Sequence, residues 1–335
     1  MSGALARMRT PITGTLRDIQ APVEERLEHV VREMHNIATD DLPLIREVSG
    51  HLLQMRGKMF RPTLALLASA VDGRPEPRAV TLAAVVELMH LATLVHDDSV
   101  DHSVLRRGLP TVNSLFSHQV SVIMGDFLYS RALTALVDMG DLDILRIVTD
   151  VANELTIGEM RELGAIDALE FSEDEYFRLI RCKTASLIAG ACESGALCGA
   201  ARYRHVLGQY GDRLGMAFQI ADDILDYTGE ESVTGKPGGL DLREHKATLP
   251  LIAALPRVSR TGRERIETLF AGETADDQLI ADVISIVADA GGIDAARQRG
   301  EQFARDAEEA LRRLPESPAR AALGDAISYV MDRRS

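Results

Sequence analysis

The chain contains no proline between Pro110 and Pro237, and this gap constrains its fold more than any other feature. The intervening stretch is rich in Ala, Leu, Ile, Glu and Arg, most of which favour helices, while the period-2 alternation of strands is hard to find. Within residues 173–199, apolar side chains recur at steps of three and four. Ser172 and Glu175 open that segment at the spacing of a capping box. The stretch therefore predicts helices joined by short glycine-containing turns.

The rest of the chain has the same helical periodicity. Residues 62–70 and 79–100 are apolar on nearly all sides, which is typical of central helices. No linker, low-complexity tract or short repeat divides the sequence, so we expect one all-α domain over residues 1–335, a large bundle of ten or more helices. The other predicted helices cover residues 23–37 and 213–227, and an amphipathic tail begins near residue 260, with breaks at Gly291–Gly292 and Pro315.

Composition and charge exclude several classes of protein. The 46% apolar content rules out a disordered chain, and the net charge of −14 without a basic block argues against nucleic-acid binding. No uninterrupted apolar run approaches the ~18 residues that span a bilayer, and no apolar segment follows Arg7 and Arg9, so no signal peptide is predicted. Cys182, Cys192 and Cys198 form no CxxC pair, which predicts buried thiols and a cytoplasmic protein.

Two acidic motifs are the sharpest functional signal. Asp97-Asp98-Ser99-Val100-Asp101 and Asp222-Asp223-Ile224-Leu225-Asp226 each end an apolar helix, where a solvated face would interleave Lys and Arg. The first and last Asp of each motif are i and i+4, so they share one helix face. Carboxylates this close repel each other, and all-oxygen ligands suit Mg²⁺, which also takes phosphate and water oxygens. The alternative reading is two acidic helix ends at the surface.

Cations accompany these acids. Lys183 lies on the apolar face of its predicted helix, which is unusual for a solvated lysine. Metal-binding carboxylates together with scattered Arg and Lys imply a substrate with several phosphates. A nucleotide is disfavoured because the chain has no P-loop. The other candidate cations are Lys58, Arg61, Arg106, Arg107, Lys236 and Lys246.

At these positions the chain resembles an all-trans isoprenyl (polyprenyl) diphosphate synthase. The resemblance runs from about Gly57 to Pro250, and several ordered motifs are more specific than any one. The motifs are Gly57-Lys58-x-x-Arg61-Pro62, Glu87-Leu-Met-His90, the first acidic motif, Arg106-Arg107-Gly-x-Pro-Thr111, Gly125-Asp-Phe-Leu128, Lys183-Thr184-Ala185, Phe218-Gln219 before the second acidic motif, Gly235-Lys236, and Lys246-x-Thr-Leu-Pro250.

The resemblance implies an all-α bundle around a deep cavity, usually a homodimer, and a role for each matched residue. Thr184 and Gln219 would lie beside the reacting carbons. Three Mg²⁺ ions would be held by Asp97, Asp98 and Asp101 on one wall and by Asp222, Asp223 and Asp226 on the other. Arg106, Lys183 and Lys236 would grip an allylic diphosphate, with Lys246 contributing, and Lys58, Arg61, His90 and Arg107 would grip isopentenyl diphosphate.

The sequence departs from the pattern of the family at one motif, residues 158–162. Family members commonly show Gly-Glu-x-x-Gln where this chain has Gly158-Glu159-Met160-Arg161-Glu162, so hydrogen bonding around the metal site is expected to differ.

Ala92 and Thr93, one turn before the first acidic motif, are small where short-chain synthases carry a bulky aromatic. With Met89 below them and Phe127 on the facing helix, we predict a product longer than four isoprene units.

Other functions stay open at this point. A farnesyl or geranylgeranyl diphosphate synthase differs only in product length. A class I terpene cyclase typically keeps one acidic motif of this kind and needs no second diphosphate site, so Lys58, Arg61 and Arg107 argue against it. A regulatory subunit of a heteromeric synthase loses acidic motifs, whereas this chain keeps both. The lipid product makes transient membrane contact plausible.

Overall fold

The computed structural model confirms an all-α fold and describes residues 14–55, 57–164, 168–229, 238–272 and 276–332. The only described strands are two short ones that pair antiparallel. In chain order the elements are α1 (Leu16–Gln20), the 3₁₀ helix η1 (Ala21–Val23), α2 (Glu24–Ala38), α3 (Pro43–Gln54), α4 (Phe60–Ala70), α5 (Ala79–Val100), β1 (Leu105–Arg106), β2 (Leu109–Pro110), α6 (Val112–Leu115), α7 (His118–Asp138), α8 (Leu142–Leu163), η2 (Ala168–Glu170), α9 (Glu173–Ile180), the π-helix η3 (Arg181–Ala185), α10 (Ser186–Leu197), η4 (Ala201–Tyr203), α11 (Arg204–Thr228), α13 (Leu240–Arg243), α14 (Leu249–Ala254), α15 (Arg260–Ala271), α16 (Asp277–Asp289), α17 (Gly292–Leu311) and α18 (Pro318–Met331).

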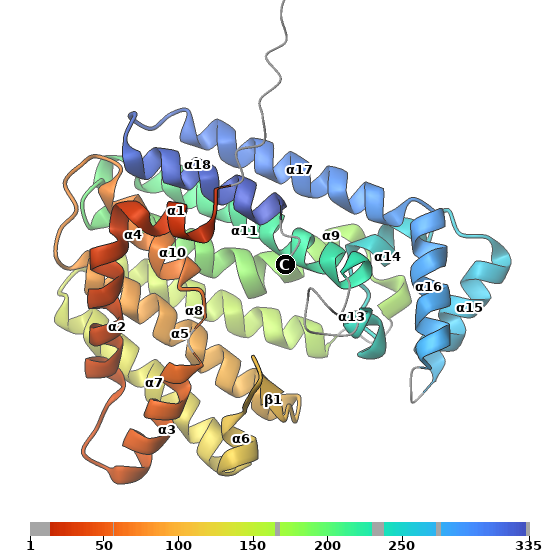
Figure 1. The fold of residues 1–335 in the computed structure, drawn as a ribbon, viewed down its shortest axis with the longest axis horizontal. Helices are drawn as coiled ribbons and strands as arrows, with labels where there is room; N and C mark the ends of the chain where they lie inside the picture. The colour runs from red at the N-terminus through yellow and green to blue at the C-terminus, as the bar shows by residue number, and fades with distance from the viewer. Residues whose placement is uncertain (1–13, 56, 165–167, 230–237, 273–275, 333–335) are drawn as a thin grey trace, which may run out of the picture.

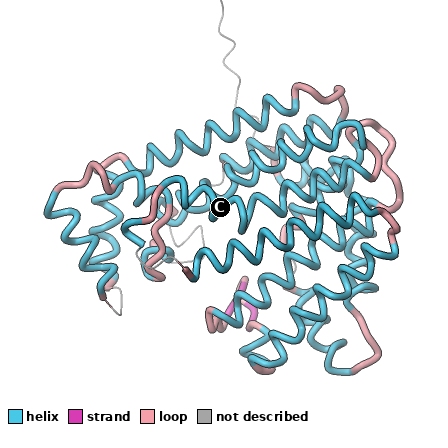
Figure 2. Tube along the Cα trace, turned by 180° about the vertical axis from the view of Figure 1, so that it is seen from behind, coloured by secondary structure: helices cyan, strands magenta, loops and turns pink. Residues whose placement is uncertain are grey.

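The helices α4 and α5 form the centre of the main core, as the sequence predicts. Their apolar side chains are buried on every side because α2, α7 and α10 pack around them. Figure 1 shows α17 and α18 covering one side of this bundle, while α15 and α16 stand together at the end opposite α2 and α3. The strands β1 and β2 sit beyond the carboxyl end of α5 (Figures 1 and 2).

The segment predicted as one helix over residues 173–199 is interrupted. Ser172 caps α9, and its capping box with Glu175 is present as expected. The backbone then widens into η3 before α10 continues to Leu197. One extra residue in a turn leaves the apolar periodicity almost unchanged, so this bulge is invisible in the sequence pattern, although such bulges often mark functional sites.

The long helix α11 lies against η3, α10 and α17. A Cβ added at Gly215 would lie 2.5 Å from the Cα of Ala185, so the absence of a side chain permits this close approach. A smaller core packs α15 and α16 against Tyr227 and Leu242. The carboxyl end of α11 is therefore held from both the main bundle and this satellite core.

Two helices reach the length and hydropathy of a membrane span, even though no uninterrupted apolar run suggested one. They are α5, which is mostly buried in the core, and α7, which is one-third buried. A buried core helix passes the same test, so the finding is weak support for a span. The three cysteines are free and buried, as expected.

Candidate active site

The first acidic motif ends α5, and its three carboxylates have different environments. Asp97 is partly buried and Asp101 is exposed, on one helix face. Burial and the nearby charge of Glu159 raise the pKa of Asp97 to about 7. Asp98 is only 3% exposed and accepts two hydrogen bonds from Arg106 Nε, at 2.8 and 2.9 Å. The first motif therefore presents Asp97 and Asp101, while Asp98 holds Arg106.

A tight hairpin follows this motif and positions the paired arginines. Arg107 and Gly108 connect β1 to β2 with φ values of 53° and 76°, as a two-residue hairpin requires. The guanidinium of Arg107 donates a 2.7 Å hydrogen bond to the Met55 carbonyl. A Cβ at Gly57 would lie 2.6 Å from Arg107 Nη1. The guanidinium therefore packs against the backbone at a position where a side chain would crowd it, which explains the glycine of this motif.

The second acidic motif ends α11 and is even less uniform. Asp222 is exposed. Asp226 accepts backbone hydrogen bonds from Leu240 and Asp241, at 3.0 and 3.1 Å, and so holds the start of α13. Asp223 is fully buried, and burial together with neighbouring acidic charge raises its pKa well above the usual range.

A chain of buried hydrogen bonds joins the second motif to η3. The Tyr176 hydroxyl donates to Asp223 Oδ2 at 2.6 Å, and Gln219 Nε2 donates to Asp223 Oδ1 at 2.8 Å. Gln219 Oε1 in turn accepts a 2.8 Å hydrogen bond from Thr184. Both carboxylate oxygens of Asp223 are therefore already bonded, and the amide orientation of Gln219 is fixed from both ends.

Lysines from two segments meet in a cavity of about 450 Å³ beside this chain of hydrogen bonds. Lys183, on η3, contacts Glu159 at 3.0 Å and also pairs with Glu162, both on α8. Lys246 lies 2.9 Å from Glu244 and 3.5 Å from Glu162. Burial lowers the pKa of Lys246, but the hydrogen bond to Glu244 and the charges of Glu162, Glu244 and Asp101 raise it overall. Because the charge of Asp101 acts on Lys246, the first acidic motif lies near this lysine.

A second basic cavity, of about 560 Å³, lies beside the start of α4. Lys58 is exposed there, and its Nζ donates a 3.3 Å hydrogen bond to Tyr329 on α18. Glu87 lies beneath it, only 3% exposed; burial raises its pKa, and the charges of Arg61 and Arg107 act against that rise. Burial and the same two arginines lower the pKa of His90 well below its usual range. The predicted residues Lys58, Arg61, His90 and Arg107 all line this cavity.

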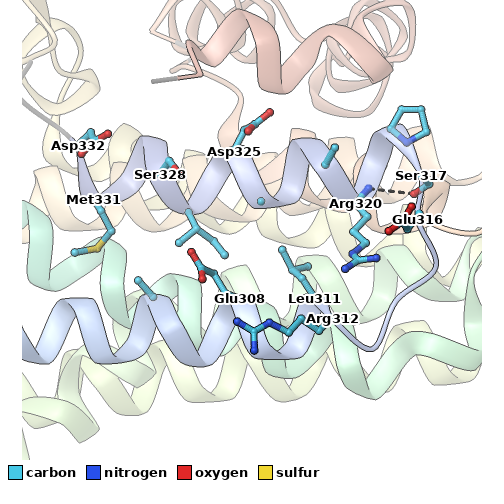
Figure 3. A pocket seen from close by; sticks show the side chains of 15 residues that line it. Glu308, Leu311, Arg312, Glu316, Ser317, Arg320, Asp325, Ser328, Met331 and Asp332 are labelled. Carbon is cyan, nitrogen blue, oxygen red and sulfur yellow. Dashed lines mark hydrogen bonds between the residues drawn. The ribbon is translucent and has the colours of Figure 1, made fainter. Parts of the chain in front are cut away.

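The larger cavity of about 920 Å³ lies away from both acidic motifs. It is a groove between α17 and α18, lined by Glu308 and Leu311 on one helix and by Arg320, Asp325 and Met331 on the other (Figure 3). None of the predicted site residues that the structure describes lines it. The two cavities with lysine and arginine side chains, not this groove, therefore carry the candidate chemistry.

The structure adds residues that the sequence reasoning missed. Asp241 lines the lysine cavity, and burial plus the charge of Asp226 raises its pKa to about 7. Tyr176 and Tyr329 reach the site from helices that carry no matched motif. No spacing rule marks a single Asp or Tyr. Lys236 lies outside the described residues.

Within the described ranges, no three His, Cys, Asp or Glu side chains converge tightly enough to hold a metal ion alone. Such a donor set fits an ion that takes one or two carboxylates from each wall and completes its shell with water and phosphate oxygens. The candidate carboxylates are Asp101 and Asp222, which are exposed, Asp97, which is partly buried, and Asp241, which lines the lysine cavity.

Comparison with known proteins agrees with this arrangement. The chain is 38% identical over 319 residues to the all-trans-nonaprenyl-diphosphate synthase (geranyl-diphosphate specific) of Rhodobacter capsulatus, covering 95% of this chain and 98% of that one. It is 35% identical to the short chain isoprenyl diphosphate synthase of Methanothermobacter thermautotrophicus, covering 94% and 98%. A polyprenyl synthase from Caulobacter crescentus CB15, solved with calcium and isoprenyl diphosphate, superposes with a TM-score of 0.90 at 32% identity, covering 96% and 99%.

The all-α fold and these relatives identify the chain as a prenyltransferase. Residues 42–287 match the family described as polyprenyl synthetase, and the chain belongs to this family. The all-α fold and the enzyme class expected from the sequence are both confirmed.

Proposed function

We propose that the protein condenses isopentenyl diphosphate with an allylic diphosphate to give a medium- or long-chain all-trans polyprenyl diphosphate. The observation that supports this proposal is the presence of two separate cavities that each contain cationic side chains, one for each diphosphate. Lys183 and Lys246 lie in the first, and Lys58, Arg61 and Arg107 lie in the second. Gln219 and Thr184 line the first cavity, and Phe218, next in sequence to Gln219, lines the second. A single-substrate cyclase has no use for the second basic cavity.

Three Mg²⁺ ions are proposed at the acidic walls, as the resemblance to the family implies, because the acidic motifs there offer carboxylate oxygens, which Mg²⁺ prefers. Asp97 would bind from α5, Asp101 from the C-cap position that follows α5, and Asp222 from α11. When bound, the ions supply the charge neutralisation that lets a diphosphate leave an allylic carbon. Asp98, Asp223 and Asp226 would act by holding the walls, since their oxygens are already hydrogen-bonded.

The chain's own residues would bind and orient both substrates. Lys183 and Lys246, with Lys236, would grip the allylic diphosphate, and Arg106 would contribute from its bond to Asp98. The neutral ring of His90 would lie among the charges of the isopentenyl diphosphate site, which comprises Lys58, Arg61, His90 and Arg107.

We propose that small side chains on α5 allow a long product. Ala92 is small and 1% exposed, and Met89 one turn below it is also 1% exposed. The similarity to the nonaprenyl-diphosphate synthase supports a long product. A shorter product is the alternative, because the chain is also similar to a short chain isoprenyl diphosphate synthase. Replacing Ala92 with Phe should shorten the product, because the ring would add bulk about one turn before Asp97, where we propose that the growing chain passes. An unchanged product distribution would place the floor elsewhere.

A homodimer is proposed from the outer face of α7 and α8. Val122, Ile123 and Val137 on α7 are 44%, 66% and 62% exposed, and Met160 and Leu163 on α8 are 65% and 71% exposed. A second copy of the chain would bury this surface. Sedimentation of the Ile123→Glu variant tests it, because a charge there should produce monomers.

We further propose a cytoplasmic enzyme of one domain whose lipid product brings only transient membrane contact. A regulatory subunit of a heteromeric synthase is the second candidate. The purified chain with isopentenyl diphosphate, Mg²⁺ and geranyl or farnesyl diphosphate distinguishes them. Elongation by the chain alone supports the synthase, and absence of elongation with either starter contradicts it.

A further inference from the structure

Glu162 bridges the two lysines of the allylic cavity. It lies in the last turn of α8, where its carboxylate pairs with Lys183 Nζ and its other oxygen lies 3.5 Å from Lys246 Nζ. The two lysines come from segments more than sixty residues apart, so this one side chain ties η3 to the segment between α13 and α14. All three side chains line the cavity of about 450 Å³.

The local helix does not favour a carboxylate here. The carboxyl end of a helix carries partial negative charge, which disfavours another negative group in the last turn. Glu162 is nevertheless 28% exposed and its pKa is lowered: burial raises it, but the hydrogen bond and charge of Lys183 and the charge of Lys246 outweigh that effect. The carboxylate is thus stabilised by the lysine pair and not by its own helix.

The carboxylate of Glu162 forms ion pairs with the same lysines that a bound diphosphate would contact. Lys183 has Glu159 as a second acidic partner, and Lys246 has Glu244. Among the residues that the structure describes, Glu162 alone pairs with both lysines. Glutamine at this position would keep an oxygen that accepts from lysine but would carry no charge.

We propose that Glu162 is a built-in counterion for the Lys183–Lys246 pair that weakens diphosphate binding and speeds release of the pyrophosphate product. The proposal rests on the function proposed above. Each elongation step must clear pyrophosphate from this cavity before the lengthened chain can occupy it. A negative charge beside the bound anion raises the free energy of the occupied state and shortens its lifetime.

The Glu162→Gln variant tests the proposal. It preserves size and the acceptor oxygen while removing one charge, so inorganic pyrophosphate should bind about tenfold more tightly at saturating MgCl2, measured by calorimetry. The KM for the allylic diphosphate should fall similarly, and the KM for isopentenyl diphosphate should not change. Turnover at saturating substrate should fall because release slows.

Glu154→Gln is the matched control. Glu154 lies two turns earlier on α8 and contacts Cys182, not the lysines. Its variant should bind pyrophosphate as the parent does. Equal or weaker pyrophosphate binding by Glu162→Gln would overturn the proposal, and Glu162→Ala repeats the comparison if the Gln variant does not fold. Pyrophosphate binding needs no catalysis, so this failure is distinct from an absence of elongation, which would overturn the proposed function.

Discussion

The hydroxyl of Tyr176 lies 2.6 Å from Asp223 Oδ2, and this buried pair positions the side chain of Gln219, which we propose lies beside the reacting carbons. Because Asp223 also accepts from Gln219, the tyrosine acts on the Gln219 amide through one intervening carboxylate. We therefore propose that the middle Asp of the second motif, Asp223, supports Gln219; its position in the sequence predicts a metal ligand.

Tyr176→Phe should lower turnover about tenfold with little change in either KM. The variant removes one donor from a buried carboxylate, which costs about 1–3 kcal/mol of stability and frees the Gln219 amide to rotate. Tyr210→Phe is the control, since Tyr210 is also buried and donates a 2.8 Å hydrogen bond to the Leu323 carbonyl, away from the site. Steady-state kinetics of both variants check this. Equal turnover losses would contradict a specific role for Tyr176.

Stability should depend on pH through Asp97 and Asp241. In the folded chain, burial and the charge of Glu159 raise the pKa of Asp97 to about 7. Burial and the charge of Asp226 likewise raise the pKa of Asp241 to about 7. The folded chain thus binds protons that the unfolded chain has released above about pH 4, so stability without metal should fall as pH rises from about 4 to 7. Thermal unfolding at pH 5.5 and pH 8 measures this.

Added MgCl2 should reverse the trend, because it binds the ionised carboxylates. The increase in Tm on adding MgCl2 should be larger at pH 8 than at pH 5.5. In the Asp97→Asn, Asp241→Asn double variant the difference should largely disappear. A Mg²⁺ effect of the same size at both pH values would contradict the assignment of these carboxylates.

Tyr329→Phe should raise the KM for isopentenyl diphosphate about three- to tenfold and leave the KM for the allylic diphosphate unchanged. The variant removes the hydroxyl 3.3 Å from Lys58 Nζ but keeps the ring, whose centroid lies 6.0 Å from that of Phe60. A change in both KM values, or in neither, would show that Tyr329 does not orient Lys58.

Gly215→Ala should destabilise the fold by about 1–3 kcal/mol and lower turnover. The added Cβ would meet the Ala185 backbone at 2.5 Å and push α11 away from η3, which carries Lys183 and Thr184. Gly50→Ala is the control, because a Cβ at Gly50 on α3 meets nothing within 4 Å and alanine favours helices. Denaturant unfolding of both variants distinguishes local packing from a general effect of replacing glycine.

The helices were predictable because their apolar periodicity and caps are local, as at Ser172 and along α5. The acidic motifs and the cations of both cavities were likewise marked by residue type and spacing. Spacing places Asp223 and Asp226 on a helix but does not reveal that their oxygens are bonded to Tyr176 and to the backbone of α13. Such partners depend on tertiary packing, as does the widened turn of η3.

The most direct test of the central proposal is elongation by the parent chain and by Asp97→Ala. With isopentenyl diphosphate, farnesyl or geranyl diphosphate and Mg²⁺, the parent should yield products longer than four isoprene units. Asp97→Ala should retain the parent's circular dichroism spectrum and lose about a thousandfold or more in turnover. Undiminished turnover in the variant, or no elongation by the parent with either starter, would contradict the proposed chemistry.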